Sequence, residues 1–312
     1  MERLTDSMLA RAGDFVWLTG RVLEQRRYAH LFEGGPAAGV LAALEAYRAP
    51  DGGYAFGVEP DVRGPAAQPV ALPAVLRILD RLGALEQESA SGLCDWLASV
   101  SAPDGGVPVV LPTLRRYPRP PWLPVSDAPA GELLATGPIA GLLRKNGITH
   151  PWLDRATAFC VAAVRGLEQT HPYEVEAALA FLEHAPDREF AAAQTARLGA
   201  LVRERRLVLL DPDHPERTPP APGYAPGEHH LVHDYAPTPD SPARSWFTEA
   251  ELARGLDELA ARQQPDGGWP INWAQWAPTT AVESRPGATL AALSTLRAWD
   301  RAADVTGAGA HR

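Results

Sequence analysis

The segment FGVEPDVRGPAAQ, residues 56–68, brings two carboxylates and an arginine together. Glu59 and Asp61 are two residues apart, and Arg63 and Gln68 follow them. When two carboxylates are close together, their mutual repulsion raises the pKa of one of them, and the rise is largest where water is excluded. A protein can in this way keep a carboxylic acid protonated at neutral pH, so that it can act as a general acid. A nearby arginine has the opposite effect and makes such a cluster a structural ion pair. The segment therefore predicts either a site, with Glu59 and Asp61 catalytic and the other two binding substrate, or a brace that caps the next helix.

Four further candidates lie at the starts of later predicted helices. His171 and Glu174 begin one of them, Glu283 lies just ahead of the last, which is predicted for residues 286–301, and Trp273 comes shortly before Glu283. Carboxylates at a helix N-terminus are stabilised by the helix dipole, so capping is the alternative function for the first pair. Aromatic faces attract cations and also stack on sugars. We predict that these four residues bind substrate.

A histidine-rich segment, GEHHLVHDY, carries residue types that bind metal ions. His229, His230, His233 and Asp234 suit zinc, but the segment is a proline-rich loop and no residue is identifiable that would orient the ligands. The two cysteines lie in apolar helical patterns, far from any paired-cysteine motif, and are predicted to be core residues. The sequence therefore predicts no metal site.

Three Asp-Gly-Gly turns mark the elements that position these candidates. They occupy residues 50–54, 103–107 and 265–269, and each follows an apolar helical pattern. Proline, aspartate and two glycines favour a tight turn at which a helix ends. The aspartates at 51, 104 and 266 are separated by 53 and 162 residues, and 162 is three times 54. This spacing predicts a repeat architecture of helical hairpins.

The chain is predicted to be all-α. Helices with one apolar face alternate with helices that are apolar almost all round, such as residues 68–82, which predicts an outer and an inner layer. The helix before the third turn begins with a capping box of Thr248 and Glu251. Residues 4–31 are predicted to be helical with a break at Gly20. The expected organisation is an N-terminal helical cap (1–34), a repeat domain (35–303) and a disordered tail (304–312).

Composition limits the partners. A net charge of −9 and a pI near 5.5 give no basic surface for nucleic acid or anionic lipid. Two cysteines cannot form a disulfide framework, the first residues lack the positive charge of a signal peptide, and no apolar run is long enough to span a membrane. The expected location is the cytoplasm, and the oligomeric state is open.

The turn QQPDGGWP and the helix ESRPGATLAALSTLRAW resemble repeats of the terpene cyclase and protein prenyltransferase superfamily. The segment EPDVRGPAAQP, together with that turn, is similar to bacterial proteins described as prenyltransferase-like. The resemblance implies an α/α toroid of about six hairpins around a central cavity. The Asp-x-Asp-Asp motif of class II cyclases, the Asp-Asp-x-x-Asp motif of class I cyclases and the Asp-x-Cys zinc pattern are all missing.

Three functions remain open at this point. The first is a cyclase-like or prenyltransferase-like enzyme that acts on a hydrophobic isoprenoid by carboxylate acid catalysis. It would need no cofactor, except Mg²⁺ if the substrate is a diphosphate. The second is a carbohydrate-active enzyme, because paired carboxylates and aromatic platforms also serve glycan chemistry. The third is a toroid that binds a ligand without catalysis.

Overall fold

The helices begin and end where the sequence places caps, prolines and glycines. Thr248 Oγ1 accepts the amide of Glu251, and Glu251 Oε2 accepts the amide of Thr248, so the predicted capping box is confirmed. The predicted break at Gly20 is also confirmed, since one helix ends at Thr19 and the next begins at Val22. The computed structural model describes the backbone of residues 3–309 and the side chains of residues 3–303.

Within residues 3–309 the structure is all-α, with two isolated β-bridges and no strand. The predicted fold class is thereby confirmed. The helices are α1 (Asp6–Thr19), α2 (Val22–Phe32), α3 (Ala37–Glu45), α4 (Leu72–Arg81), α5 (Gln87–Val100), α6 (Leu133–Lys145), α7 (Pro151–Arg165), α8 (Pro172–Leu182), α9 (Arg188–Glu204), α10 (Val232–Tyr235), α11 (Glu249–Ala261) and α12 (Pro278–Gly309). None of these helices is both long and apolar enough to cross a bilayer.

The chain divides into two compact units. Unit 1 comprises Met1–Val40 and Gly199–Arg312, and unit 2 comprises Leu41–Leu198. The domain boundaries predicted after residues 34 and 303 stay a prediction.

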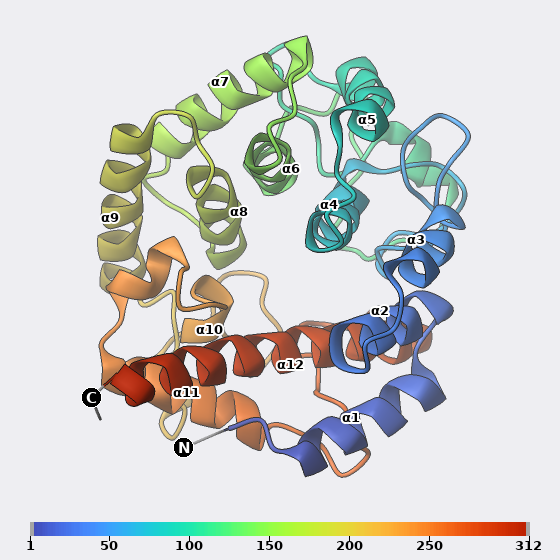
Figure 1. The fold of residues 1–312 in the computed structure, drawn as a ribbon. Helices are drawn as coiled ribbons and strands as arrows, with labels where there is room; N and C mark the ends of the chain where they lie inside the picture. Colours follow the sequence, from blue (N-terminus) through green and yellow to red (C-terminus); the bar gives the residue numbers. More distant parts are fainter. Residues whose placement is uncertain (1–2, 310–312) are drawn as a thin grey trace. The chain divides into compact units, whose positions relative to one another are not determined.

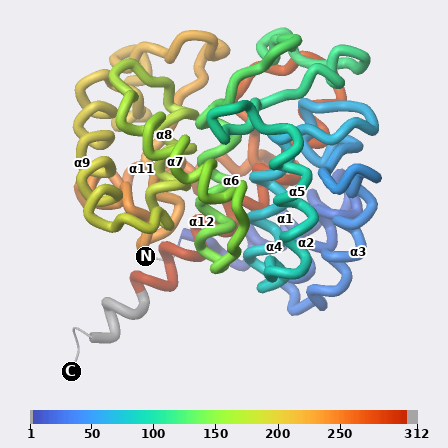
Figure 2. The backbone as a smooth tube through the Cα atoms, turned by 90° about the horizontal axis from the view of Figure 1, so that it is seen from above, coloured from blue at the N-terminus to red at the C-terminus, as the bar shows by residue number. Residues whose placement is uncertain are grey.

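In unit 2, the helices α4, α6 and α8 form one layer, with α6 in contact with both neighbours (Figures 1 and 2). The helices α5 and α7 pack against each other in a second layer. Nine of the thirteen residues of α6 are buried, as expected for a helix of the inner layer. The helix α4 differs from its predicted all-apolar character, because Arg77 in its middle is exposed.

Two glycines let α6 approach α8 closely. A Cβ atom at Gly137 would lie 2.5 Å from the carbonyl oxygen of Ala177, and one at Gly141 would clash with the carbonyl oxygen of Ala180. Gly137 and Gly141 are one helical turn apart, so they present one side-chain-free strip to the partner backbone. The position of α8 in unit 2 therefore depends on this strip.

The three Asp-Gly-Gly turns share one hydrogen-bond pattern. In each turn the aspartate Oδ1 accepts the amide of the second glycine, at distances of 3.0–3.1 Å. The first glycines have φ angles of 94°, 92° and 92°, a region that suits glycine. The second glycine of each turn lies against an aromatic ring of another helix: Trp96 of α5, Phe159 of α7 or Phe15 of α1. Each turn is therefore a docking point for a helix that lies outside its own hairpin.

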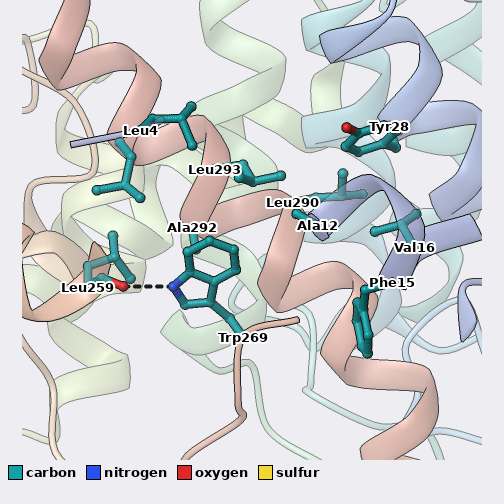
Figure 3. Close-up of a cluster of buried hydrophobic side chains, with 11 residues drawn as sticks. Leu4, Ala12, Phe15, Val16, Tyr28, Leu259, Trp269, Leu290, Ala292 and Leu293 are labelled. Carbon is teal, nitrogen blue, oxygen red and sulfur yellow. Dashed lines mark hydrogen bonds between the residues drawn. The ribbon is translucent and has the colours of Figure 1, made fainter. Parts of the chain in front are cut away.

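The core of unit 1 surrounds Trp269, directly after the third turn (Figure 3). Its side chain is 2% exposed, and its indole Nε1 donates to the carbonyl oxygen of Leu259 at 2.7 Å. Residues of α1 (Ala12, Phe15, Val16) and of α12 (Leu290, Ala292, Leu293, Leu296) complete this core together with Leu4, Tyr28 and Leu259. Trp269 is thus a packing residue of unit 1.

The last helix is longer than its sequence pattern predicts. The apolar pattern of residues 286–301 places its start at Pro286, whereas α12 begins at Pro278 and continues to Gly309. Proline fits the first helical turn because its missing amide hydrogen is not needed there. Both Pro278 and Pro286 could therefore stand at the start of the helix. In the structure, α12 begins at Pro278, and Pro286 lies inside it.

Candidate functional site

The loop of residues 56–64, which carries the paired carboxylates, has a fixed conformation. The Phe56 amide donates to the carbonyl oxygen of Gly64 at 3.0 Å and closes the loop. Gly64 has a φ of 93°, and a Cβ atom there would lie 2.5 Å from the ring of Tyr117. Any larger residue at 64 would displace this ring. The loop is therefore clamped between its own closing hydrogen bond and a second loop of unit 2.

A tight turn at the start of this loop carries an unusual residue. The Val58 amide donates to the carbonyl oxygen of Ala55 at 3.2 Å, and the two central residues, Phe56 and Gly57, have φ angles of 58° and 76°. Positive φ at both central positions defines a type I′ turn, which favours Asn, Asp or Gly. A phenylalanine in this region costs about 1–2 kcal/mol. Its side chain remains 49% exposed.

The paired carboxylates follow in the next turn of the loop. The Val62 amide donates to the backbone oxygen of Glu59 at 3.0 Å, and the Asp61 amide lies 3.4 Å from Oε1 of Glu59. Both Glu59 and Asp61 are half-buried. The guanidinium of Arg63 folds back toward the start of the loop, since Nη1 would lie 3.3 Å from a Cβ atom placed on Gly57. These contacts position the Glu59 carboxylate and the Arg63 guanidinium within one loop.

Arg77 of α4 interacts electrostatically with carboxylates of this loop and of α8. Burial lowers the pKa of the Arg77 guanidinium, while the negative charges of Glu176 and Glu59 raise it. The side chain is nevertheless exposed to solvent. Unit 2 thus places the Arg77 guanidinium of α4 within electrostatic range of one carboxylate of α8 and one carboxylate of the loop.

A second arginine lies one helical turn further along α4. Burial lowers the pKa of Arg81, the charge of Arg77 lowers it further, and Asp80 raises it. Asp80 itself accepts hydrogen bonds from Lys145 Nζ at 2.8 Å and Asn146 Nδ2 at 2.9 Å. The exposed side of α4 therefore carries two positive charges at the spacing at which helix side chains are neighbours.

Gln68 is fully buried and joins two loops. Its amide nitrogen donates to Thr113 Oγ1 at 3.0 Å, and its oxygen accepts the Leu111 amide at 2.7 Å. Because these bonds engage both ends of the side-chain amide, Gln68 holds the loop after the second Asp-Gly-Gly turn against the start of α4.

His171 and Glu174 make the contacts of a helix cap. His171 Nδ1 accepts the amide of Tyr173 at 3.4 Å, and Glu174 Oε2 accepts the amide of His171 at 3.2 Å. These are the contacts that the capping alternative requires. A substrate-binding function for the pair stays a prediction. Glu176, two residues further along α8, is the carboxylate that acts on Arg77.

The remaining two candidates, Trp273 and Glu283, belong to unit 1. Both side chains are half-buried, Trp273 in the loop before α12 and Glu283 in the helix itself. The neighbouring Arg285 forms a bidentate ion pair with Asp266 of the third turn, with distances of 2.7 and 2.8 Å. A substrate-binding function for Trp273 and Glu283 stays a prediction.

In the histidine-rich segment of unit 1, the Nδ1 atoms of His230 and His233 make local contacts. His230 Nδ1 lies 2.6 Å from the hydroxyl of Tyr224, and His233 Nδ1 lies 3.4 Å from Oδ1 of Asp234. Burial alone would raise the pKa of Asp234, but the charge and hydrogen bond of His233 outweigh it and lower this pKa to about 2. Among the described residues no three ligand-type side chains are grouped so that they could hold a metal ion.

We predict that the purified protein holds no zinc after dialysis against a chelator. A tetrahedral site needs three or four ligands, and the described residues contain no group of three ligand-type side chains that could hold a metal ion. Elemental analysis checks this, and the expected zinc content is well below one equivalent. One equivalent that survives dialysis and disappears in His233→Asn would contradict the prediction.

The sequence signal for Arg77 was present but not recognised. Arg77 and Arg81 interrupt an otherwise apolar helix one turn apart, and such a charge in a helix predicted to be buried requires a partner. The partners, Glu59 and Glu176, are far from it in the chain. Only the packing of α4, α6 and α8 brings them together.

Comparison with known proteins shows the fold alone. No protein-family model matches the chain, and no curated protein matches it in sequence. A crystal structure of a protein from Actinoplanes is similar with a TM-score of 0.58 and 18% identity, over 94% of this chain and 98% of that one. The apo structure of the type II terpene cyclase MstE from Scytonema aligns with a TM-score of 0.46 and 13% identity, over 95% of this chain and 88% of that one.

Proposed function

We propose that this chain is an enzyme that acts on a hydrophobic isoprenoid-type substrate by proton transfer, with Glu59 and Asp61 as its catalytic carboxylates. The observation that carries the proposal is the turn that holds Glu59 and Asp61 together in one half-buried loop, with the charge of Arg77 within electrostatic range of Glu59. The proposal also draws on the Asp-Gly-Gly turns and the EPDVRGPAAQP segment, whose sequences resemble those of isoprenoid-processing proteins.

The charges around the loop lead us to assign different catalytic functions to Glu59 and Asp61. The guanidinium of Arg77 is a positive charge within electrostatic range of Glu59. We therefore assign the donated proton to Asp61 and the ionised carboxylate to Glu59. Asp61 would protonate a carbon–carbon double bond, whose π electrons form the new C–H bond and leave a cation on the other carbon. Glu59 would stabilise that cation or accept a proton from the carbon beside it.

The other residues would support this step. Arg63 would orient the loop, and Gln68 would hold the start of α4 in place. If the substrate is a diphosphate, Arg77 and Arg81 offer guanidinium groups to its oxygens, and Mg²⁺ would enter with the substrate. No further cofactor is proposed.

Conversion of isoprenoid alcohols and diphosphates, followed by mass spectrometry of the products, tests the proposal. We expect Asp61→Asn to lower turnover about 100-fold or more, because a general acid contributes that much and an amide cannot donate an acidic proton. The thermal midpoints of Asp61→Asn and Arg63→Gln should stay close to that of the unaltered protein. Glu45→Gln removes an exposed carboxylate of α3 and should leave turnover unchanged.

Three results would contradict the proposal. If the thermal midpoints of Asp61→Asn and Arg63→Gln both fall by many degrees, Asp61 and Arg63 form a structural ion pair. If Asp61→Asn retains full turnover, the proton comes from elsewhere. A protein that binds the substrates but converts none of them would be a binding protein.

A further inference from the structure

We propose that the ring of Phe56 is a contact for the apolar part of the ligand that reaches the Glu59 loop. This inference rests on the proposed function, since it names a further residue of the same site. Phe56 occupies the first central position of a type I′ turn, with a φ of 58°. Local backbone preference favours Asn or Gly at this position. The phenylalanine is therefore present in spite of the turn.

Packing inside the protein does not account for this choice of residue. The Phe56 side chain is 49% exposed, so its burial recovers only part of what a core phenylalanine contributes. Tyr54, two residues earlier, shows the contrast, because it is 6% exposed and occupies the core. A residue that opposes its local backbone preference and also exposes an apolar ring marks a functional position.

The ring is presented by a loop that cannot easily move. The Phe56 amide closes the loop on Gly64, and the ring of Tyr117 packs against Gly64. A rigid aromatic group loses little conformational entropy when a ligand binds. Phe56 is thus prepared for contact before the ligand arrives.

The loop also sets the chemical character of the ligand. Glu59, three residues after Phe56, lies within electrostatic range of Arg77. One end of the loop is therefore apolar and the next turn is charged. A ligand that has an apolar chain next to its reacting group fits this arrangement. The ring of Phe56 would bind the apolar chain, and the charged residues that follow it in the loop would be near the reacting group.

The experiment uses the full-length protein with Phe56→Asn and radiolabelled farnesol as the probe, measured by equilibrium dialysis. Asparagine adopts positive φ readily and removes the ring. We expect the thermal midpoint to rise by about 2 °C because the turn is relaxed. We expect the farnesol dissociation constant to rise about tenfold because the contact is lost. Phe56→Tyr, which keeps the ring, should retain the affinity.

A matched control separates relief of backbone strain from loss of the ring. Arg206 is the other non-glycine residue of the described chain with positive φ, at 53°, and it lies just after the end of α9. Arg206→Asn should also raise the thermal midpoint, and it should leave farnesol binding unchanged.

Three results would overturn the inference. A lower thermal midpoint for Phe56→Asn would show that the ring is structural. An unchanged farnesol affinity would show that the ring does not contact the ligand, and an unaltered protein that does not bind farnesol would show that the ligand class is wrong. The proposed function is judged separately, by the effect of Asp61→Asn on turnover. Loss of turnover in Asp61→Asn with unchanged binding by Phe56→Asn would remove the inference and leave the function.

Discussion

Replacing Gly141 by alanine should lower the free energy of unfolding by about 3 kcal/mol, because the added methyl group has no space. The Cβ atom would clash with the carbonyl oxygen of Ala180 and lie 3.1 Å from the Cα atom of Phe181. Both are backbone atoms of α8, so a rotamer change cannot relieve the contact. The helices α6 and α8 would have to separate, which would loosen the inner layer of unit 2. Urea unfolding followed by circular dichroism measures the loss.

Gly92 provides the control for this substitution. It lies inside α5 of the same unit, and a Cβ atom there would have no heavy atom of another residue within 4 Å. Alanine is a better helix former than glycine by about 1 kcal/mol, so Gly92→Ala should stabilise the protein slightly. The two substitutions have opposite expected signs although they are chemically identical. If Gly141→Ala stabilises the protein as Gly92→Ala is expected to do, α6 and α8 do not approach each other as closely as described.

Replacing Arg285 by glutamine should cost about 2–3 kcal/mol of stability in unit 1. The guanidinium makes two hydrogen bonds to Asp266, donates to the carbonyl oxygen of Trp269 at 3.2 Å and lies 4.6 Å from the centre of the Phe15 ring. One side chain thus holds the third Asp-Gly-Gly turn, α12 and α1 together. Glutamine can replace one of these contacts at most. Thermal and urea unfolding measure the effect.

The same pair predicts a pH dependence. The hydrogen bonds from Arg285 hold the pKa of Asp266 below its ordinary value, although burial opposes the shift. A carboxyl group whose pKa is lower in the folded state contributes stability that is complete above its unfolded pKa, about 3.9, and disappears as the pH falls through the folded-state pKa. The stability difference between the unaltered protein and Arg285→Gln should therefore be constant above about pH 5 and shrink below about pH 4.

A second arginine of unit 1 serves as the control. Arg254 pairs with Asp211 at 3.0 Å, but its side chain is 55% exposed and exposed pairs contribute little. Arg254→Gln should cost less than about 1 kcal/mol at any pH. An equal loss in both variants, or a loss for Arg285→Gln that does not depend on pH, would contradict the function assigned to Arg285.

Local features of the fold could be predicted from the sequence because they depend on residues within about four positions. The capping box of Thr248 and Glu251, the break at Gly20 and the three Asp-Gly-Gly turns are of this kind. Turn and cap chemistry is decided by the residues themselves. The alternation of half-exposed and buried helices could be predicted for the same reason, since periodicity is a local pattern. The start of α12 could not be placed, because Pro278 and Pro286 both satisfy the rule for a first helical turn.

The candidate site shows where such reasoning ends. That Glu59 and Asp61 share a short loop before a buried helix could be predicted from the order of residues alone. The same order also indicated both alternatives for His171 and Glu174, whose observed contacts are those of a cap. The electrostatic interaction of Arg77 with Glu59 and Glu176 became evident from the tertiary structure, because it depends on how α4, α6 and α8 pack. Only the structure decided that Phe56 has positive φ, because the closing bond to Gly64 and the ring of Tyr117 impose that turn against local preference. Contacts between residues distant in the chain are selected by the packing of the whole unit, and no local pattern encodes them.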